Sequence, residues 1–462
     1  MDKLVNRKFR KSKLLLKVEL ENGKKAVFSN TTGSIAVMDS EVETILDSFE
    51  NPAYLKEVCK NDPLCEKAVN ELLKKGILVE EETDEYERLK SEINKLRSLE
   101  ERYSFTFVLT TRCNFNCVYC YEDKTPLDMM WKTAKKCIDF IEDRVKETGQ
   151  KDVKIRLYGG EPLLKFDLIK RILNTTRKRL PSIEITTSIG TNGSLLTEEK
   201  ISFLKKYECK YIQTNIDGIK SIHDSRRPYK NGDSSFDDVI NGLRIALDSS
   251  VRVGLRINID KNNVDEVPEF LEYLKLNNIN SPNMGVLFER IFIVTEKCGP
   301  YKKHCIPPYK WGKEYIKLSK LAQKLGFRCH ISLPPRFLYC TAYIKSNVKF
   351  NPDGNLISCW GAAGNCPEEF IVGNVFNDPV YNSNADKFFK RSPLDFEECR
   401  NCDIVAFCGG GCIASAYTEN GTLNSVYCPY QKYNFKELAK FYVKECFADE
   451  KIYERVDFDR LL

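Results

Sequence analysis

The sequence lacks several features that would assign it to other classes of protein. Its 462 residues contain no apolar run of 18, so we expect no membrane-spanning helix. The N-terminus is basic, but Lys17 interrupts its only apolar run and no secretion signal is recognisable. The net charge of +6 is small and spread along the chain, so composition alone does not argue for a nucleic-acid partner. We therefore expect a cytoplasmic protein with no membrane partner.

Histidine is scarce, whereas cysteine is abundant. Only His223, His304 and His330 occur, and nothing in their spacing selects a general base. Cysteine occurs 19 times. Because cytoplasmic disulfides are reduced, clustered cysteines in such a protein more often bind metal ions or iron–sulfur clusters. The remaining composition, with 42% hydrophobic and 30% charged residues, is that of a globular protein.

Residues 1–95 predict a small separate domain of α+β type. Two strands are expected at 13–21 and 24–29, joined by the hairpin signal Asn22-Gly23. Helical patterns follow from Ser40, from Ala53 and over 66–75, and 77–79 reads as a closing strand or wing. A charged helical linker then extends to about residue 103. The arrangement is typical of a winged helix.

Residues 104–325 predict an α/β domain. Short apolar runs alternate with helical patterns, at 105–110, 153–158, 183–189, 211–216, 252–259 and 284–292. Such alternation indicates parallel βα units, and six units suit an open, partial (β/α)6 TIM-like barrel. Residues 326–462 lose this rhythm and become rich in Gly, Pro, Asn and Cys. We expect there a loop-rich domain stabilised by bound clusters.

The first group of cysteines follows the first strand of the barrel. Cys113, Cys117 and Cys120 have the spacing C-x3-C-x2-C. Three thiolates on one loop can bind three irons of a four-iron cluster and leave the fourth iron open. The alternatives are a zinc site or cysteines without a ligand role. Their position after the first strand of a βα series favours the cluster.

This loop in this place resembles the radical S-adenosylmethionine (SAM) superfamily, whose members bind SAM to the open iron. Tyr158-Gly159-Gly160-Glu161-Pro162, after the second strand, resembles the family's glycine-rich motif for the methionyl amine. The resemblance implies that Gly159 and Gly160 let the backbone approach SAM and that Glu161 accepts a hydrogen bond from its ammonium group.

Three further residues match family positions around SAM. Asn192 follows the third strand and Asn215 ends the fourth, where both would line the ribose and methionyl region. Many relatives carry Ser at the position of Asn215, and either side chain can bond a hydroxyl. Arg256 on the fifth strand resembles the arginine that pairs with the carboxylate of SAM. Taken singly, each could instead be a turn residue or a surface group.

Seven downstream cysteines resemble the SPASM extension of peptide-modifying radical SAM enzymes. They are Cys340, Cys359, Cys399, Cys402, Cys408, Cys412 and Cys428. The family implies two auxiliary four-iron clusters. Of these, the first would be held by Cys340, Cys359 and Cys412, and the second by Cys399, Cys402, Cys408 and Cys428. Two full clusters need eight ligands. The eighth ligand is Cys329 or Cys366, or it is absent and leaves one iron open to a substrate thiolate. A zinc ribbon is the alternative.

The remaining cysteines have no ligand spacing and are expected to be small buried hydrophobic residues. They are Cys59, Cys65, Cys137, Cys209, Cys298, Cys305 and Cys446. The N-terminal domain also resembles the leader-peptide recognition domain of many peptide maturases, in which a strand edge accepts the peptide. Its basic residues would then attract an acidic leader; they are Arg7, Lys8, Arg10, Lys11 and Lys13. A DNA-binding winged helix or a solvated basic tail are the alternatives.

The resemblance implies a radical SAM oxidoreductase that cross-links a ribosomally made precursor peptide, most simply through cysteine thioethers. Its cofactors would be SAM and three 4Fe-4S clusters, one binding SAM and two auxiliary. Its partners would be the precursor peptide with its leader and a reducing electron donor of the flavodoxin or ferredoxin type. Anaerobic sulfatase maturation is the second interpretation. A redox-sensing DNA-binding regulator is the third, because it does not explain the SAM motifs.

Overall fold

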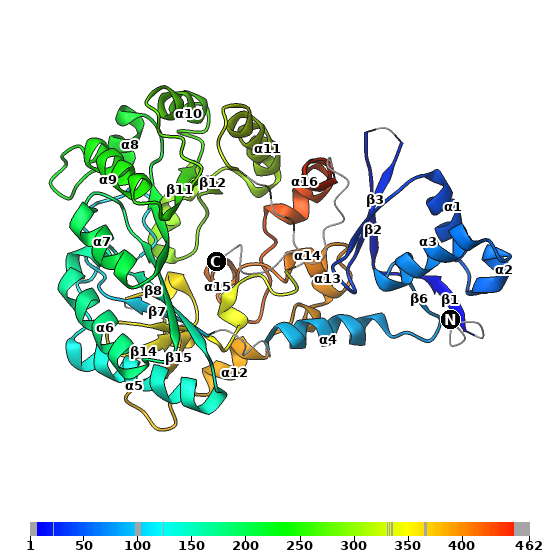
Figure 1. The fold of residues 1–462 in the computed structure, drawn as a ribbon, viewed down its shortest axis with the longest axis horizontal. Helices are drawn as coiled ribbons and strands as arrows, with labels where there is room; N and C mark the ends of the chain where they lie inside the picture. The colour runs from blue at the N-terminus through cyan, green and yellow to red at the C-terminus, as the bar shows by residue number, and fades with distance from the viewer. Residues whose placement is uncertain are drawn as a thin grey trace.

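Three regions follow one another along the chain in the computed structural model, which describes residues 7–21, 23–97, 103–122, 124–329, 331, 333, 336–364 and 367–447. The N-terminal unit lies at one end and the barrel at the other, and the C-terminal helices lie between them (Figure 1). A search of the described residues finds no helix long and apolar enough to cross a membrane.

The N-terminal unit consists of two small sheets and four helices. One antiparallel sheet has the order β2-β3-β4, formed by Leu15–Glu19, Lys25–Ser29 and Ile35–Met38. The other has the order β5-β1-β6, formed by Ala53–Tyr54, Lys8–Lys11 and Leu78–Glu80. The helices are α1 (Ser40–Asp47), α2 (Leu55–Cys59), α3 (Pro63–Lys74) and α4 (Glu85–Arg97).

The expected hairpin pairs β2 with β3 in register, although Asn22 itself lies outside the described residues. Helix α1 begins after Asp39, whose carboxylate accepts from the N–H of Val42 at 3.0 Å and so caps the helix. Strands β1 and β4 were not predicted, because each has only four residues. A second correction concerns Cys59 and Cys65, which form a disulfide between α2 and α3 rather than separate buried thiols.

The barrel has six parallel strands, one for each apolar run in the sequence. They are β7 (Tyr103–Val108), β8 (Asp152–Tyr158), β9 (Glu184–Gly190), β10 (Cys209–Asn215), β11 (Arg252–Ile259) and β12 (Met284–Arg290). The helices between and after them are α5 (Trp131–Thr148), α6 (Phe166–Arg179), α7 (Glu198–Lys206), α8 (Lys220–Arg226), α9 (Phe236–Asp248), α10 (Val267–Leu276) and α11 (Pro308–Lys324). The expected partial α/β barrel is therefore present.

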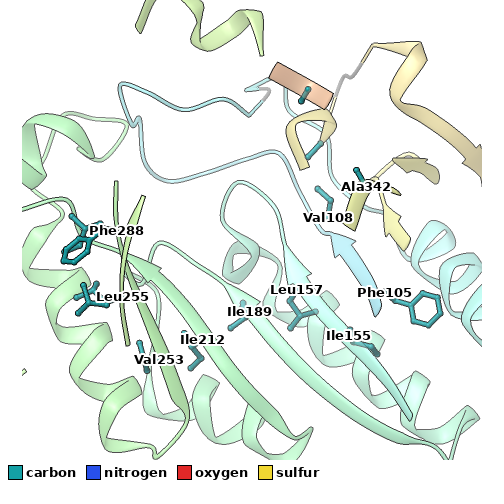
Figure 2. Packing of buried hydrophobic residues seen from close by; sticks show 14 of the residues in the cluster. Phe105, Val108, Ile155, Leu157, Ile189, Ile212, Val253, Leu255, Phe288 and Ala342 are labelled. Atoms are coloured by element: carbon teal, nitrogen blue, oxygen red, sulfur yellow. The ribbon is translucent and has the colours of Figure 1, made fainter. Parts of the chain in front are cut away.

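Alternate residues of each barrel strand point to opposite faces of the sheet. Phe105, Ile155, Leu157, Ile212 and Leu255 belong to one buried core with residues of the surrounding helices. Figure 2 shows these side chains on neighbouring strands. Residues of the other parity face the concave side, where the polar side chains of the site lie.

The sheet continues into the C-terminal region, which the sequence predicted to be loop-rich. β13 (Asn347–Phe350) pairs in parallel with β7, and β14 (Asn355–Ile357) and β15 (Ile371–Asn374) extend the sheet to nine strands. The order is β12-β11-β10-β9-β8-β7-β13-β14-β15. The sheet thus crosses the proposed boundary at residues 325 and 326. Strands of three or four residues give too short a pattern to recognise in a sequence.

The rest of this region consists of short helices and one long helix. They are α12 (Asn384–Phe389), α13 (Glu397–Arg400), α14 (Val405–Cys408), α15 (Ile413–Asn420) and α16 (Tyr430–Phe447). Helix α16 packs against α11 and also contacts β2 of the N-terminal unit. There Phe28 meets Phe407 and Phe435 edge-on, with ring centroids 5.4 and 5.2 Å away. The C-terminal region therefore joins the two ends of the molecule.

Candidate functional site

The three cysteines of the C-x3-C-x2-C motif lie on the loop between β7 and α5. Backbone hydrogen bonds hold this loop on the end of α8, from the N–H of Asn116 to the carbonyl of Pro228 and from that of Val118 to Arg226. The N–H of Phe115 donates to the sulfur of Cys113 at 3.4 Å. These bonds fix the middle of the cluster loop, between Cys113 and Cys120, against the barrel.

The three thiols are half-buried and close enough to act on one another. Burial, with the negative charges of Glu161 and the neighbouring thiols, raises the pKa of Cys113 to about 12. The pKa of Cys120 is likewise raised to about 12 by burial and by Glu122 and Cys117. Thiolates in such a place need positive charge beside them, and iron ions supply it. The donor set therefore suits a metal cluster.

The glycine-rich motif packs directly on the cluster loop. The N–H of Gly160 donates to the carbonyl of Thr110, and that of Glu161 donates to Arg112, both at 2.9 Å. A Cβ on Gly159 would lie 2.4 Å from the Thr110 oxygen, and one on Gly160 would lie 2.6 Å from the Arg112 oxygen. Gly159 also has a φ of +145°, which favours glycine. The backbone of the cluster loop therefore leaves no room for a side chain at either glycine.

Glu161 connects the end of β8 to the loop that follows β9. Its carboxylate is fully buried and accepts from the N–H of Asn192 at 2.7 Å, from the N–H of Leu163 at 2.9 Å and from the hydroxyl of Thr191 at 2.8 Å. Burial raises its pKa, and these three donors oppose that shift. A carboxylate can accept about four hydrogen bonds, so these donors position Glu161 between β8 and β9 and leave it able to accept from the ammonium group of SAM.

Asn192, Asn215 and Arg256 lie along the ends of neighbouring strands. The amide nitrogen of Asn192 donates to Asn114 at 2.7 Å and lies 3.8 Å from the sulfur of Cys113. Asn215 pairs in register with Arg256, and its buried side-chain oxygen has no hydrogen-bond partner among the described residues. The Nε of Arg256 donates to Asn258 at 2.9 Å. A free amide oxygen beside a guanidinium suits a ligand with hydroxyl and carboxylate groups.

A buried ion-pair network behind the cluster loop was not predicted. The hydroxyl of Tyr119 donates to Asp217 at 2.5 Å, and Arg227 donates to that hydroxyl at 2.8 Å. Arg226 bridges Asp217 and Asp260, with the shorter bond at 2.7 Å. Burial alone would raise the pKa of Asp217, but the two arginines hold it below its usual range. The sequence signal was the pair Arg226-Arg227 after the fourth strand, whose orientation the sequence left open.

His223 is excluded as a general base by its surroundings. It is fully buried, its Nδ1 faces the N–H of Asp217 at 3.4 Å, and its Nε2 lies 3.2 Å from the hydroxyl of Ser235. Burial lowers its pKa to about 3. His304 lies near Tyr301 and Asn262, and His330 is outside the described residues.

The seven downstream cysteines gather into two sets. Burial and the nearby thiols of Cys412 and Cys340 raise the pKa of Cys359 to about 12. The pKa of Cys408 is raised to about 12 by burial and by three other thiols, those of Cys402, Cys399 and Cys428. The chain passes between the two sets at residues 409–411, three glycines with positive φ. One set has three thiols and the other has four.

The search for an eighth ligand has a partial answer. Cys329 is buried, and besides burial the groups that act on its pKa are Ser319 and Glu445, with none of the seven cysteines among them. Cys366 lies outside the described residues. Within the described residues, no three His, Cys, Asp or Glu side chains converge where a single metal ion could bind. A four-iron cluster differs from a single ion in that each thiolate binds its own iron.

Aromatic and charged side chains fill the space between the SAM motifs and the three-thiol set. The hydroxyls of Tyr121 and Tyr158 lie 2.6 Å apart, and the ring of Tyr158 packs on Trp360 at 4.6 Å. Burial raises the pKa of Glu122, which bonds Tyr158, to about 7. Burial also lowers the pKa of Lys349 to about 8, although the Cys340 and Cys359 thiols oppose this.

Comparison with known proteins identifies the superfamily. Residues 107–274 match the model of the radical SAM superfamily, a stretch that contains the cluster loop and all the SAM motifs named above. An uncharacterized protein of Methanocaldococcus jannaschii is 34% identical over 253 residues, which are 54% of this chain and 82% of that protein. The chain belongs to the radical SAM superfamily. As a radical SAM enzyme it uses SAM and a four-iron cluster.

Two longer relatives extend beyond the radical SAM region. The radical SAM cyclopropyl synthase TigE of Paramaledivibacter caminithermalis is 22% identical over 97% of this chain and 98% of its own. A cysteine-type anaerobic sulfatase-maturating enzyme of Clostridium novyi is 23% identical over 73% of this chain and 96% of its own. The first alignment thus includes the N-terminal unit of this radical SAM enzyme.

Two solved structures share the fold. Native anSMEcpe with bound AdoMet and Kp18Cys peptide has a TM-score of 0.57 and 17% identity, and the match covers 73% of this chain and 98% of that one. Streptococcus suis SuiB bound to the precursor peptide SuiA has a TM-score of 0.53 and 16% identity, with 91% and 99% covered. At these identities the likeness describes the fold of this radical SAM enzyme alone.

Proposed function

We propose that this radical SAM enzyme cross-links a ribosomally made precursor peptide, through thioethers from cysteine thiols to carbon. The observation that carries the proposal is the arrangement of three cysteine sets in one chain. The set of Cys340, Cys359 and Cys412 lies beside the SAM motifs, because Trp360 follows Cys359 and packs on Tyr158. The structures of anSMEcpe with bound Kp18Cys peptide and of SuiB bound to the precursor peptide SuiA support a peptide substrate.

The residues of this chain bind and orient, and the cofactors supply the hard chemistry. Cys113, Cys117 and Cys120 would hold the cluster, while Asn215 and Arg256 would hold the ribose and carboxylate of SAM. A bound cluster and SAM supply a radical able to remove hydrogen from an unactivated carbon. Tyr121, Tyr158 and Trp360 pack together beside the SAM motifs and would keep water from the reacting carbon.

The auxiliary sites favour a thiol as the second reacting group. Cys399, Cys402, Cys408 and Cys428 would complete one auxiliary cluster. Cys340, Cys359 and Cys412 would hold three irons of the other, whose fourth iron would bind either Cys366 or a substrate thiolate, because none of the seven cysteines acts on Cys329. A thioether forms when a C–H and an S–H are replaced by a C–S bond, so two hydrogens leave per cross-link. One would leave as a hydrogen atom taken by the radical, and the other as a proton from the thiol and an electron that would pass to an auxiliary cluster. A carbon–carbon bond is the alternative product, in line with TigE being a cyclopropyl synthase.

The N-terminal unit is proposed to bind the leader by its backbone rather than by charge. The basic residues expected to attract an acidic leader are largely neutralised within the unit. Arg10 pairs with Glu85 at 2.6 Å, Arg7 pairs with Glu80, and Lys11 pairs with Glu50 and Asp47. The same pairs weaken the case for a DNA-binding regulator.

A groove between α3 and β6 suits an extended peptide. It has a volume of about 810 Å³, and Leu73, Leu78 and Val79 supply its apolar wall. Within the described residues, β6 pairs only with β1, so its outer edge can accept a further strand. An electron donor of the flavodoxin or ferredoxin type completes the proposed set of partners.

Anaerobic co-expression with a cysteine-containing peptide encoded beside the gene tests the proposed reaction. We expect a mass loss of two hydrogens per cross-link and thiols that no longer react with an alkylating agent. The triple variant Cys113→Ala, Cys117→Ala, Cys120→Ala is the control and should lose reductive SAM cleavage while it keeps auxiliary iron. SAM cleavage by that variant would refute the cluster assignment.

A variant that fills the groove tests the leader site. Asn70 lines the groove on α3, so Asn70→Trp should weaken binding of the precursor peptide at least tenfold and leave uncoupled SAM cleavage intact. Leu64→Trp is the matched control, because Leu64 is on the same helix, is 77% exposed and does not line the groove. Equal peptide affinity in the two variants would contradict this site.

Sulfatase maturation is the second candidate, and the relative from Clostridium novyi supports it. That alignment covers 73% of this chain, and the proposed leader-binding unit has no role in oxidising a single sulfatase residue. An unchanged peptide in the co-expression test, together with formylglycine in a co-expressed sulfatase, would favour this candidate.

A further inference from the structure

Two cations, the half-buried Arg156 and the buried Lys349, lie on the concave face of the barrel, and neither has a carboxylate partner in the described part of the chain. Arg156 is on β8 and Lys349 is on β13, and both lie beside Trp360. The guanidinium carbon is 4.9 Å and the ammonium nitrogen 5.5 Å from the centre of that ring. Lys349 is 1% exposed, so its ammonium group is cut off from water. The two like charges raise each other's free energy in this setting.

Strand pairing fixes these side chains in one row. Lys349 pairs with Thr106, Thr106 pairs with Arg156, and Arg156 pairs with Ser188 across adjacent strands. Residues paired in register point to the same face of a sheet, so the row is continuous. Arg156 lies two residues before Tyr158, which is about 7 Å along the strand. The row is therefore directly below the motifs assigned to SAM.

The row also contains polar atoms without partners. The Nε of Arg156 and the hydroxyl of Thr106 are buried and make no hydrogen bond with any described residue. The charged groups that act on Arg156 are the phenols of three tyrosines and the cation of Arg256. Of the buried carboxylates around the SAM motifs, that of Glu122 bonds Tyr158, and that of Glu161 accepts from Thr191 and Asn192. Lys349 donates to the side-chain oxygen of Asn347 at 2.9 Å, and the thiols of Cys340 and Cys359 act on it. A buried donor without an acceptor is costly, so Arg156 is the cation of the row that lacks a negatively charged acceptor.

We propose that Arg156, assisted by Lys349 and Thr106, binds a carboxylate of the substrate peptide close to the carbon that loses hydrogen. This inference rests on the proposed peptide-maturase function and names a feature of its substrate. The carboxylate comes from an Asp or Glu side chain or from the C-terminus of the peptide. Given the position of Arg156 on β8, the carboxylate lies within about three residues of the modified position.

The test compares three synthetic peptides on the reconstituted enzyme with SAM bound. All share a central cysteine and a fluorescent label. One has a Glu beside the cysteine and an amidated C-terminus, one has Gln and a free C-terminus, and one has Gln and an amide and hence no carboxylate. Dissociation constants come from fluorescence anisotropy. A charge-assisted hydrogen bond to a buried group predicts that one of the first two binds about 10- to 100-fold tighter than the third.

The variants connect that preference to the row. Arg156→Gln should abolish the preference, and Arg156→Lys should retain part of it. Lys349→Gln provides a second, independent variant and should reduce the preference. Arg244→Gln is the matched control, because Arg244 is exposed on α9 and donates to the carbonyl of Asn277. It should leave the preference unchanged.

Two results would overturn the proposal. One is equal affinity of the wild type for the three peptides, and the other is a preference that survives in Arg156→Gln. In the latter case a shifted reduction potential of an auxiliary cluster would identify Arg156 as a counter-charge for the cluster. Failure of the proposed function has a different signature: SAM is cleaved, but no precursor peptide is bound or altered. Loss of the binding preference alone would overturn only the carboxylate site.

Discussion

Replacing Glu161 with Gln tests whether this carboxylate positions the SAM motifs. The carboxylate accepts from three donors, the N–H groups of Leu163 and Asn192 and the hydroxyl of Thr191. In Glu161→Gln one oxygen becomes an NH2 group, so one of the two buried N–H groups faces another donor. An unsatisfied buried donor costs about 1–3 kcal/mol, and the lost charge on the remaining bonds adds to this. The variant no longer buries a charge, which offsets part of this cost and leaves a net cost of about 2 kcal/mol.

That free energy is divided between folding and SAM binding, because Asn192 is both a partner of Glu161 and a neighbour of Cys113. If all of it reached SAM, the dissociation constant would rise about 30-fold. We expect about a tenfold rise, measured by anaerobic calorimetry on enzyme with its iron content verified. Glu147→Gln is the control, because its ion pair with Arg144 is on the surface. Wild-type SAM affinity and wild-type stability in Glu161→Gln would refute the reasoning.

Two further predictions concern the core and the contact between regions. Burial lowers the pKa of His223 to about 3 from its ordinary 6.5, so the unfolded chain binds a proton that the folded chain does not. The free energy of unfolding is therefore unaffected by this group above pH 6.5 and is about 2 kcal/mol lower at pH 5. Denaturant unfolding of His223→Gln should lack this part of the pH dependence. Asn30 donates to the carbonyl of Asp403 at 2.5 Å and accepts from the N–H of Ala406 at 3.0 Å. Asn30→Ala should cost about 2–4 kcal/mol at this contact and speed amide hydrogen exchange at Ala406; unchanged exchange would contradict it.

The barrel could be predicted because its signal is repeated and long. Each of its six strands has six to eight residues, and helical patterns separate most of them, so an error in one run does not change the architecture. The additional strands of the sheet have three or four residues each and pair through distant partners, such as Lys349 with Thr106. Nothing local in residues 347–374 distinguishes such strands from loop segments.

The candidate site divides in the same way. Cysteine spacing is a covalent property of the chain, so the thiol sets could be grouped from the sequence with the help of a family resemblance. The role of Glu161 depends on Asn192 and Thr191, which are some 30 residues away, and could not be read locally. The same holds for Tyr119 and Arg227, which meet over a sequence separation of 108 residues.

The distribution of unpaired charge indicates how the two ends of the molecule divide recognition. In the N-terminal unit Arg7, Arg10 and Lys11 have carboxylate partners, so a peptide bound there gains little from charge. In the barrel Arg156 and Lys349 have none among the described residues, and there a carboxylate gains the most, because water does not screen the contact. Under the proposed function, a leader that pairs with a strand edge would therefore be free to vary in sequence. Under the same proposal, the modified segment would need its carboxylate to keep its position under SAM.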